Sequence, residues 1–455
     1  MPNWLLKEMA PLIADPVCAI FNASIRQGCV PVIWKQANVV PVPKAHPPKS
    51  LQNDLRPISL TSTLAKVLES FIGSWILNKI QPNLANNQFG ALKGKSTSHA
   101  LVAVLHTWCC ALDAGESVRA LFVDFTKAFD RVDHTLLLNK LVAYGVPCTI
   151  IKWLFSFLKD REQRVKVGQI YSAWCTLAAG FPQGTWLGPL AFITIIDDLQ
   201  PPCTVHKFVD DTTFTEIIAS KNTPSRMDEF CVKLEQWSAQ NHMKVNYTKT
   251  KEMLLGKVKI QSIPTLTVSG NPIQRVSCFK LLGVHISDNL LWENHVDAIC
   301  SKANTRLYFL KRLKRAGLSV KDLCCFHTTM IRPVLEYACV VWHHGLTKAQ
   351  SDRLEALQKR AVRIIHGRAA YNMPYEDLLA LSHLESLSHR RTALGKSFFK
   401  KTIQPTSCLH HLLPPSRTLD LTSRLRHAVQ YEHPLVHTKR YRSFINFGLA
   451  HYQNN

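Results

Sequence analysis

The chain has 455 residues, of which 46% are hydrophobic and 19% charged, and this ordinary composition argues against global disorder. Its formal net charge of +23 is not ordinary: it predicts a surface that follows a polyphosphate backbone, with solubilising charge on exposed helices as the alternative. Fourteen cysteines without a C-x-x-C pair, and no apolar run of the ~18 residues that a membrane span needs, argue against a disulfide framework, a zinc knuckle and a membrane protein.

Residues 1–35 predict two helices. Apolar residues recur at helical spacing, and Gly28 and Pro31 follow as stop signals. Val39–Lys44 reads as a strand. Ser98–Leu112 predicts a helix with one apolar side, formed by Leu101, Val104, Leu105 and Trp108.

Val118–Val123 is an apolar run typical of a buried strand, and it puts Asp124 at a strand end. His134–Tyr144 then shows helical spacing. Asp130 and Asp133 precede that helix, where acidic residues are favoured by the helix dipole.

Arg164–Leu177 has the pattern of a hairpin, and Val205–Val209 and Thr212–Ile218 predict two further strands. Asp210 and Asp211 fall at the tight reversal between those two strands, where Asp is favoured.

Asp124, Asp210 and Asp211 can meet if the two strand ends lie side by side. Three carboxylates repel one another unless cations sit between them, and hard oxygen ligands suit Mg²⁺. Two such ions would stabilise the attacking and leaving oxygens of an in-line phosphoryl displacement. The alternative is that the Asp-Asp pair only begins a hairpin. A second acidic pair, Asp197-Asp198, is interpreted as a structural cap or turn.

The C-terminal part is predicted to be helical. Met227–Gln240 is an amphipathic helix, the pattern from Trp292 onward is helical, and Ser351–His366 is a helix stopped by Gly367. Residues 301–455 hold 25 Lys and Arg against 9 Asp and Glu, so this third is the expected backbone clamp. Residues 403–455 have weaker periodicity and are expected to form a loosely packed extension.

Several ordered motifs resemble those of one family. The segments Phe-Val-Asp-Phe-Thr-Lys-Ala-Phe-Asp (122–130), Gly-Phe-Pro-Gln-Gly-Thr-Trp-Leu-Gly-Pro-Leu (180–190) and Phe-Val-Asp-Asp (208–211) resemble motifs A, B and C of reverse transcriptases. The flanking segments 55–60, 66–69 and 88–90 resemble those of non-LTR retrotransposons of the Jockey and CR1-like branch. Any one of these motifs is weak, but their order over this length makes chance similarity improbable.

The resemblance implies an α+β fold of the right-hand polymerase type, with fingers, a ferredoxin-like palm and a helical thumb. We expect an N-terminal helical extension (1–35), fingers and palm (36–285), a helical thumb (286–402) and a basic C-terminal extension (403–455). Such elements usually encode an upstream endonuclease, so we expect the chain to be a fragment of a longer reading frame, active in the nucleus or the cytoplasm.

The resemblance also implies site residues. Asp124, Asp210, Asp211 and the backbone carbonyl of Phe125 would bind two Mg²⁺ ions, with Asp211 the less certain ligand. Lys249, in a segment resembling motif D, would lie near the leaving pyrophosphate, where it would act as a general acid or offset the developing charge. The 279–285 segment resembles motif E, a hairpin that grips the primer end.

Further residues are implied for the nucleotide and the nucleic acid. The expected nucleotide-binding residues are Arg56, Lys66, Phe129, Gln183 and Gly184. Phe129 would exclude a 2′-hydroxyl, with core packing as its alternative. The expected contacts with RNA template, DNA primer or nicked target DNA are Lys44, Lys93, Lys95, Trp186, Lys311, Arg312, Lys314 and Arg315. Each of the fingers cations could instead be a solvated charge.

Two departures from the family pattern leave an alternative open. Ala91-Leu92 replaces the commoner Phe-Arg, and Trp186 replaces a smaller residue, so that it could stack on the templating base or simply pack. A catalytically inactive nucleic-acid-binding relic is therefore the rival hypothesis. Telomerase-like and group II intron-like enzymes share this palm, but the thumb sequence favours the retroelement.

Overall fold

The computed structural model describes residues 3–44, 47–51, 54–219, 224–257, 263–370, 372–417 and 429–453, and part of the predicted C-terminal extension lies outside them. The expected α+β class is confirmed. Two compact units interleave along the chain: Met1–Ala91, Val123–Thr212 and Glu229–Thr250 form the first, and Leu92–Phe122, Thr213–Asp228 and Lys251–Asn455 the second. The expected four-part division stays a prediction.

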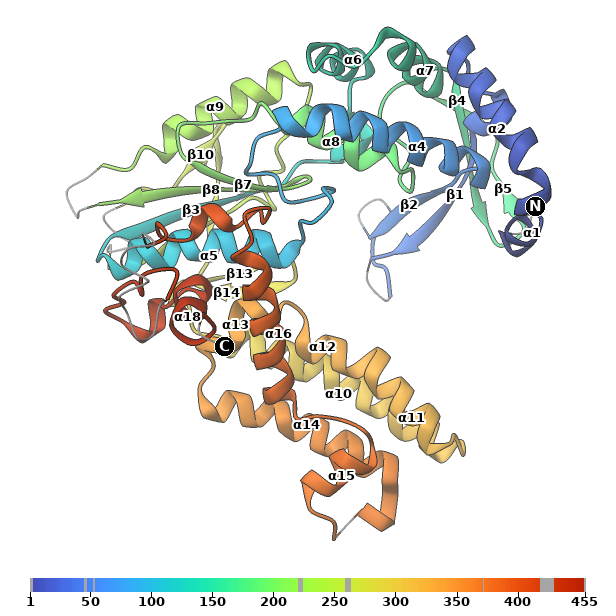
Figure 1. Cartoon of the computed structure of the whole chain (residues 1–455). Helices are drawn as coiled ribbons and strands as arrows, with labels where there is room; N and C mark the ends of the chain where they lie inside the picture. The colour runs from blue at the N-terminus through green and yellow to red at the C-terminus, as the bar shows by residue number, and fades with distance from the viewer. Residues whose placement is uncertain are drawn as a thin grey trace. The chain divides into compact units, whose positions relative to one another are not determined.

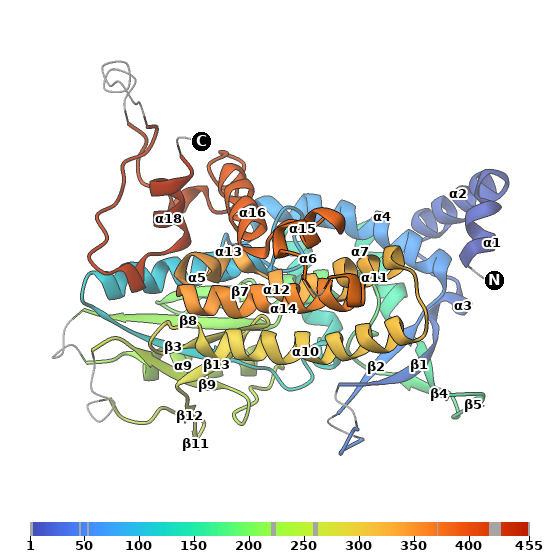
Figure 2. The same cartoon turned by 90° about the horizontal axis from the view of Figure 1, so that it is seen from below.

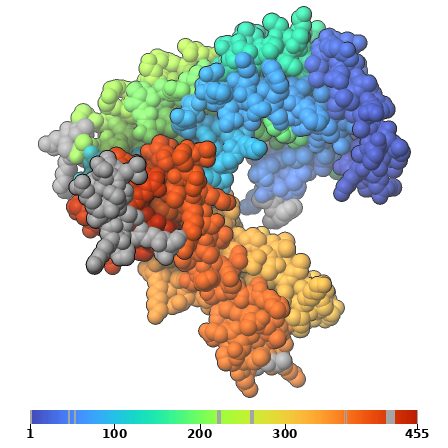
Figure 3. All heavy atoms as spheres, in the orientation of Figure 1, coloured from blue at the N-terminus to red at the C-terminus, as the bar shows by residue number. Residues whose placement is uncertain are grey.

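The first unit begins with the expected N-terminal helices α1 (Asn3–Glu8) and α2 (Ala10–Gln27), followed by the short α3 (Val32–Lys35). Gly28 ends α2 in the left-handed conformation, with φ of 63°. Helix α2 lies beside α7 (Cys148–Leu158), where the Trp153 indole donates to Ser24 Oγ at 3.0 Å (Figure 1). In Figure 3, α1 and α2 are the dark blue spheres at the surface of this unit.

A mixed sheet follows in the first unit, with strand order β2-β1-β4-β5 and β6 paired to β4. Its strands are β1 (Gln36–Pro43), β2 (Leu55–Leu60), β4 (Arg161–Val167), β5 (Ile170–Tyr171) and β6 (Cys175–Leu177). Side chains alternate between two faces. One face buries Ala37, Val39, Ser59 and Arg161, and the other is more open to solvent.

Helix α8 (Leu187–Ile196) of the first unit is buried along its whole length because it is apolar on every side. Helices α4 (Thr63–Ile80) and α6 (His134–Ala143) contact it, and the same unit contains α9 (Met227–Gln240) and strand β7 (Thr204–Phe208). Lys207 of β7 is buried, and its ammonium donates to the carbonyls of Ile196 (2.8 Å) and Asp197 (2.9 Å) at the end of α8. This capping fixes β7 against α8.

The second unit has a sheet with the order β12-β9-β3-β8. Its strands are β3 (Ser117–Val123), β8 (Asp211–Ile218), β9 (Lys251–Leu255) and β12 (Gln274–Arg275), and α5 (Thr97–Asp113) belongs to the same unit. Glu252 on β9 accepts from Arg119 on β3 (2.5 Å) and from Arg275 on β12 (2.7 Å), and Arg119 and Glu252 are fully buried. This ion network ties the three strands in one register.

The rest of the second unit is mainly helical, as expected. After the hairpin β13 (Cys278–Leu281) and β14 (Val284–Ser287), the helices are α10 (Glu293–Arg315), α11 (Val320–Phe326), α12 (Arg332–Glu336), α13 (Cys339–Trp342), α14 (Lys348–His366), α15 (Tyr375–Leu381), α16 (Leu387–Thr402) and α18 (Phe444–His451). Helices α10 and α14 pack along each other (Figure 2). None of the helices described is long and apolar enough to cross a membrane.

Candidate active site

Asp124 follows directly after β3, as the sequence predicts, and the segment 244–250 holds its backbone. The Asp124 N–H donates to Thr250 Oγ1 at 3.2 Å, and its carbonyl accepts from the Asn246 N–H at 2.8 Å. The next residue, Phe125, pairs antiparallel with Val245. These contacts fix the backbone of Asp124 at the end of β3 and do not involve its carboxylate.

Asp210 and Asp211 occupy the reversal between β7 and β8, as expected. Val209 precedes them in the left-handed conformation, with φ of 59°, which is rare for a β-branched residue. The turn therefore has a defined and unfavourable backbone conformation, and the contacts around it must maintain it.

The three carboxyl groups lie close enough to affect one another. Burial raises the pKa of Asp211 to about 6, with the charges of Asp210 and Asp124 adding to the effect. Burial also raises the pKa of Asp210, and the charge of Asp124 raises it further. The pKa of Asp124 is raised by burial too. The site thus concentrates negative charge that a cation would relieve.

Lysines offset part of this charge. Lys249 Nζ lies 4.0 Å from Asp124 Oδ2, and the Lys249 side chain is 66% exposed. Lys249, a hydrogen bond from the Asn246 side chain and the charge of Lys44 each lower the pKa of Asp124 against the effect of burial. Two predicted cations, Lys249 and Lys44, are therefore near Asp124.

The motif B loop lies against motif A. The Gly180 N–H donates to Val132 O (3.0 Å), and the Phe181 N–H donates to Phe129 O (2.9 Å). Gly180 has φ of 81°, and a Cβ there would lie 2.6 Å from Asp130 O. A glycine is required at this close approach.

Gln183 and Gly184 extend this loop towards the sheet of the first unit. The Gln183 carbonyl accepts from the Ser59 N–H of β2 at 2.7 Å. The Gln183 side chain hydrogen-bonds the carboxyl of Asp130, which lowers the pKa of that group against the effect of burial. Gln183 therefore joins β2, motif A and motif B.

The ring of Phe129 is only partly buried, with its centroid 5.4 Å from that of Phe192 in α8. It packs on α8 and is only partly exposed to solvent. Asp133 is the side-chain cap of α6, accepting from the Leu136 N–H at 2.9 Å, as expected of a helix-start acid.

Trp186 packs on α4. A Cβ at Gly73 of α4 would lie 2.0 Å from Trp186 Cζ3, so the missing side chain at Gly73 makes room for the indole. The Trp186 N–H also donates to Glu69 Oε2 at 3.1 Å, and the carboxyl of Glu69 is buried with a raised pKa. The ring remains 39% exposed. Trp186 thus packs against α4, one of the two alternatives expected from the sequence. Stacking of its indole on a base stays a prediction.

The other predicted residues divide between the two units. Arg56 is exposed on β2, and Lys66 lies on the first turn of α4. In the second unit, Lys95 is half-buried near Cys408, and burial lowers its pKa, whereas Lys93 is exposed. The four cations predicted on the thumb are in the last turns of α10: Lys311, Arg312, Lys314 and Arg315.

Asp197 and Asp198 have structural contacts, as interpreted from the sequence. Asp197 accepts from the Ala85 N–H (2.9 Å) and from the Tyr144 hydroxyl (2.5 Å). Asp198 pairs with Lys140 at 2.7 Å and accepts from the Trp237 indole. Both carboxylates therefore take part in contacts between elements of the fold.

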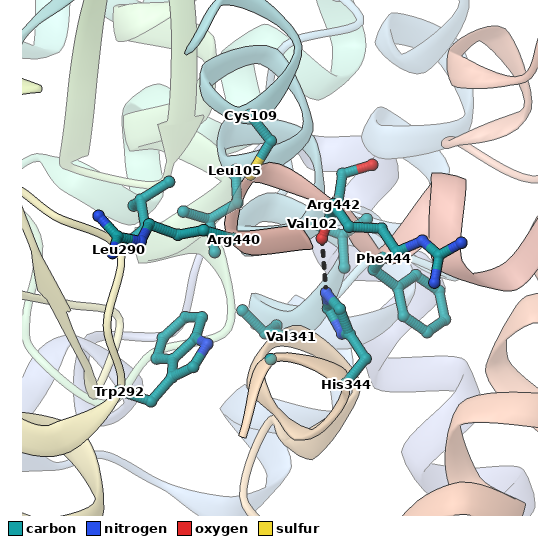
Figure 4. Close-up of a pocket in the computed structure, with 12 residues that line it drawn as sticks. Val102, Leu105, Cys109, Leu290, Trp292, Val341, His344, Arg440, Arg442 and Phe444 are labelled. Carbon is teal, nitrogen blue, oxygen red and sulfur yellow. Dashed lines mark hydrogen bonds between the residues drawn. The ribbon is translucent and has the colours of Figure 1, made fainter. Parts of the chain in front are cut away.

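Figure 4 shows a different pocket, in the second unit. Apolar side chains including Trp292 and Val341 line it with Arg440, and His344 Nε2 donates to the Arg442 carbonyl at 3.1 Å. About 30 Å³ of free space is enough for only a few water molecules. This pocket is too small for a nucleotide.

The donor set of the three carboxylates fits a hard cation. Asp124 Oδ2 is buried and accepts no hydrogen bond from the described residues. Within the described ranges, no three His, Cys, Asp or Glu side chains are arranged to hold a metal by themselves.

A family model described as "Reverse transcriptase (RNA-dependent DNA polymerase)" matches residues 42–286, more than half of the chain. The chain belongs to the reverse transcriptase family. The right-hand polymerase fold expected from the sequence is therefore confirmed. A second, short match, to the N-terminal part of alkylated DNA repair protein alkB homolog 8, covers only residues 292–332.

Two relatives of this reverse transcriptase family member come from mobile elements of Drosophila melanogaster. The chain is 28% identical to a probable RNA-directed DNA polymerase from transposon BS, over 80% of the chain and 42% of that protein. It is 24% identical to the RNA-directed DNA polymerase from mobile element jockey, over 91% of the chain and 47% of that protein. The chain thus spans less than half the length of these relatives, and the resemblance to the Jockey branch is confirmed.

Among solved structures, apo telomerase from Candida tropicalis matches 88% of the chain and 73% of its own length, with 11% identity and a TM-score of 0.43. A telomerase from the same organism, in complex with a fragment of telomeric RNA, gives a TM-score of 0.42 at 12% identity, over 97% of the chain and 68% of its own length. Likenesses at this level support no further conclusion.

Several residues around the site were not predicted as functional. The sequence around Gln88 has no sign of a functional role beyond the Gln-Phe-Gly segment, yet its side-chain oxygen accepts a hydrogen bond from the Val209 N–H. Gly73 makes room for the Trp186 indole, and Glu69 accepts from the Trp186 backbone N–H. The Asn246 N–H donates to the Asp124 carbonyl. The motif D resemblance includes Asn246, so a closer reading of that segment could have found it.

Proposed function

We propose that the chain is an RNA-directed DNA polymerase of a non-LTR retrotransposon. The 3′-hydroxyl of a primer attacks the α-phosphate of a dNTP, a phosphodiester bond forms, and pyrophosphate leaves. The observation that carries this proposal is the group of three acids, Asp124, Asp210 and Asp211, whose pKa values are raised by burial and, for Asp210 and Asp211, also by neighbouring acids, with Lys249 beside Asp124.

Asp124, Asp210, Asp211 and the backbone carbonyl of Phe125 would hold two Mg²⁺ ions. When bound, these ions stabilise the attacking and leaving oxygens of the displacement. The chain's part is to hold the carboxylates in place. The hydrogen bond from the Asp124 N–H to Thr250 Oγ1 and the one from the Asn246 N–H to the Asp124 carbonyl support that role.

Lys249 would protonate the leaving pyrophosphate or offset its charge, a role supported by its exposure and by its distance of 4.0 Å from Asp124. Phe129 would exclude the 2′-hydroxyl of a ribonucleotide, a role supported by its ring, which packs on α8 and is partly exposed to solvent.

The phosphates and the base of the incoming dNTP would contact residues expected in the fingers. Arg56 can fork onto two phosphate oxygens, and Lys66 supplies a point charge. Gln183 and Gly184 would approach the nucleotide where the motif B loop contacts Ser59. Lys44 would contact the template near Asp124.

The open face of the fingers sheet suits a template strand. Arg56, Arg164, Lys166 and Tyr171 share this face by strand register. The Arg164 guanidinium lies 4.1 Å from the ring centroid of Tyr171 and 4.5 Å from that of Trp174, and both rings are about 40% exposed. Cations interleaved with aromatic rings bind single strands through phosphate contacts and base stacking.

The second unit would bind the RNA template and the DNA primer or nicked target DNA through phosphate contacts. Its proposed contacts are Lys93, Lys95, Lys311, Arg312, Lys314 and Arg315. Trp186 would add a base contact in the first unit. A nuclear or cytoplasmic location follows from this role and stays a prediction.

The rival function is a nucleic-acid-binding relic. Trp186 is weaker support for a relic than the sequence suggests, because Gly73 makes room for the indole. Ala91-Leu92 remains its support: Ala91 has φ of 55°, a conformation disfavoured for alanine.

Primer extension on an RNA template with dNTPs and Mg²⁺ tests the proposal. We expect the purified chain to extend the primer, and Asp210→Ala to abolish extension while template–primer affinity stays within a few-fold. Salt-sensitive binding of the template–primer without extension by the parent chain would support the relic instead.

A further inference from the structure

The turn that presents Asp210 and Asp211 depends on a side chain from another part of the first unit. The Val209 N–H donates to Gln88 Oε1 at 3.0 Å. Val209 has φ of 59°, so its backbone is held in a conformation that a β-branched residue rarely adopts. A specific acceptor at this amide is one contact that maintains the conformation.

Gln88 is itself rigidly placed. Its side chain is 1% exposed, and Oε1 also accepts from the Gly90 N–H at 2.8 Å. One carbonyl oxygen therefore joins the segment around Gly90 to the turn around Val209. A Cβ on Gly90 would lie 2.5 Å from Val209 Cγ2, so the two backbones meet closely and only glycine fits there.

Backbone pairing adds to this connection. The Phe89 N–H donates to Lys207 O, and the Lys207 N–H donates to Asn87 O, both at 2.8 Å. The Lys207 ammonium is anchored at the end of α8. Residues 87–89 thus form a short parallel partner of β7, and the Gln88 side chain continues the contact past the end of that strand into the turn.

An amide suits this position for an electrostatic reason. Asp210 and Asp211 follow Val209 directly, and their carboxylates already repel each other and Asp124. Gln88 supplies an acceptor oxygen without adding negative charge. Its contact with the turn is also made through the backbone, so it leaves both carboxylates available.

We propose that Gln88 is a positioning residue, which holds the Val209–Asp211 turn in the conformation that presents Asp210 and Asp211 to the metal ions. This inference rests on the proposed polymerase function. Gln88 does not contact the reacting atoms. It acts through the backbone of the turn, as residues behind metal ligands often do.

Three variants test the proposal. Gln88→Met keeps the length of the side chain but removes the acceptor, and Gln88→Glu keeps an acceptor oxygen. The matched control is Thr194→Val, which removes a buried hydroxyl that donates to Leu190 O at 2.9 Å within α8, a bond that involves neither Gln88 nor the turn. Each is compared with the parent by incorporation rate, dNTP KM, half-saturating Mg²⁺ concentration and amide exchange of the 205–212 peptide.

For Gln88→Met we expect kcat to fall by about 10–100-fold and half-saturating Mg²⁺ to rise, with the dNTP KM within about threefold. Exchange in the 205–212 peptide should accelerate by ~10-fold. Gln88→Glu restores the acceptor oxygen but adds a negative charge beside the three acids, so it should accelerate exchange of the 205–212 peptide less than Gln88→Met does and recover kcat only in part. Thr194→Val should leave every readout near the parent.

The proposal is overturned if Gln88→Met keeps the parent's kcat and Mg²⁺ dependence, or if Thr194→Val loses activity to the same extent, since the loss would then reflect general destabilisation. Incorporation by the parent chain distinguishes failure of the Gln88 proposal from failure of the polymerase proposal. A parent without incorporation refutes the polymerase, whereas the exchange of the 205–212 peptide still decides whether Gln88 holds the turn.

Discussion

Replacing Asp211 with Asn should make the metal-free protein more stable at neutral pH. In the folded chain, burial and the charges of Asp210 and Asp124 move the pKa of Asp211 from 3.8 to about 6. A shift of this size corresponds to ~3 kcal/mol at ~1.4 kcal/mol per pKa unit. The Asp211 residue is solvent-exposed by surface area, so solvent screening reduces the expected effect to ~1 kcal/mol.

The sign of the effect depends on pH. Because the folded-state pKa of Asp211 is higher than the unfolded value, the folded parent binds the extra proton between pH 4 and 6, and its stability falls as pH rises through that window. Asp211→Asn should therefore gain ~1 kcal/mol of unfolding free energy over the parent at pH 7 and little at pH 4. Urea unfolding without divalent metal measures this difference.

Mg²⁺ should reduce this difference in stability. A ligand that binds only the folded chain adds ~1.4 kcal/mol at ten times its Kd, and Asp211→Asn should gain less than the parent because a ligand is lost. Asp198→Asn is the matched control, as it changes the second acid of the other Asp-Asp pair. It loses charge opposite Lys140, so it should be less stable at pH 7 with an unchanged Mg²⁺ response. Lower metal-free stability of Asp211→Asn at pH 7, or an undiminished response to Mg²⁺, would refute the reasoning.

Three other variants give further predictions. Phe129→Ala should admit ribonucleotides, reducing sugar discrimination by ~10-fold or more in competition incorporation assays; unchanged discrimination would leave Phe129 as a packing residue. Lys249→Ala should slow incorporation by ~100-fold, and Lys249→Arg by less, in single-turnover assays; equal rates in all three chains would remove Lys249 from the chemistry. Gly73→Ala should cost about 1–3 kcal/mol in urea unfolding, because the new methyl group meets Trp186. Adding Trp186→Ala should recover part of that loss, whereas strict additivity would contradict the packing.

Local patterns were enough to predict the elements that carry the acids. The apolar run before Asp124 and the two runs flanking Asp210-Asp211 predicted a strand end and a tight reversal, and the structure has both. The two acidic pairs could also be told apart, because Asp197-Asp198 follows the motif B helix whereas Asp210-Asp211 lies between two strands.

Contacts between distant segments were not predictable. From the sequence, stacking on a base and packing both stayed open for Trp186, because the glycine that accommodates it lies far earlier in the chain, within a helical pattern that gives no sign of the contact. The hydrogen bond from the Val209 N–H to Gln88 Oε1 could not be predicted either, because the two residues are far apart in the sequence. No propensity rule predicts a left-handed valine, which depends on the tertiary contacts around the turn.

The most direct test of the central claim is single-turnover incorporation of one dNMP opposite an RNA template by the parent, Asp210→Asn and Asp198→Asn. If Asp210 helps to bind the catalytic metals, the parent and Asp198→Asn incorporate at rates within a few-fold of each other, and Asp210→Asn is slower by ~10³-fold or more. Incorporation by Asp210→Asn at the parent's rate would contradict the account.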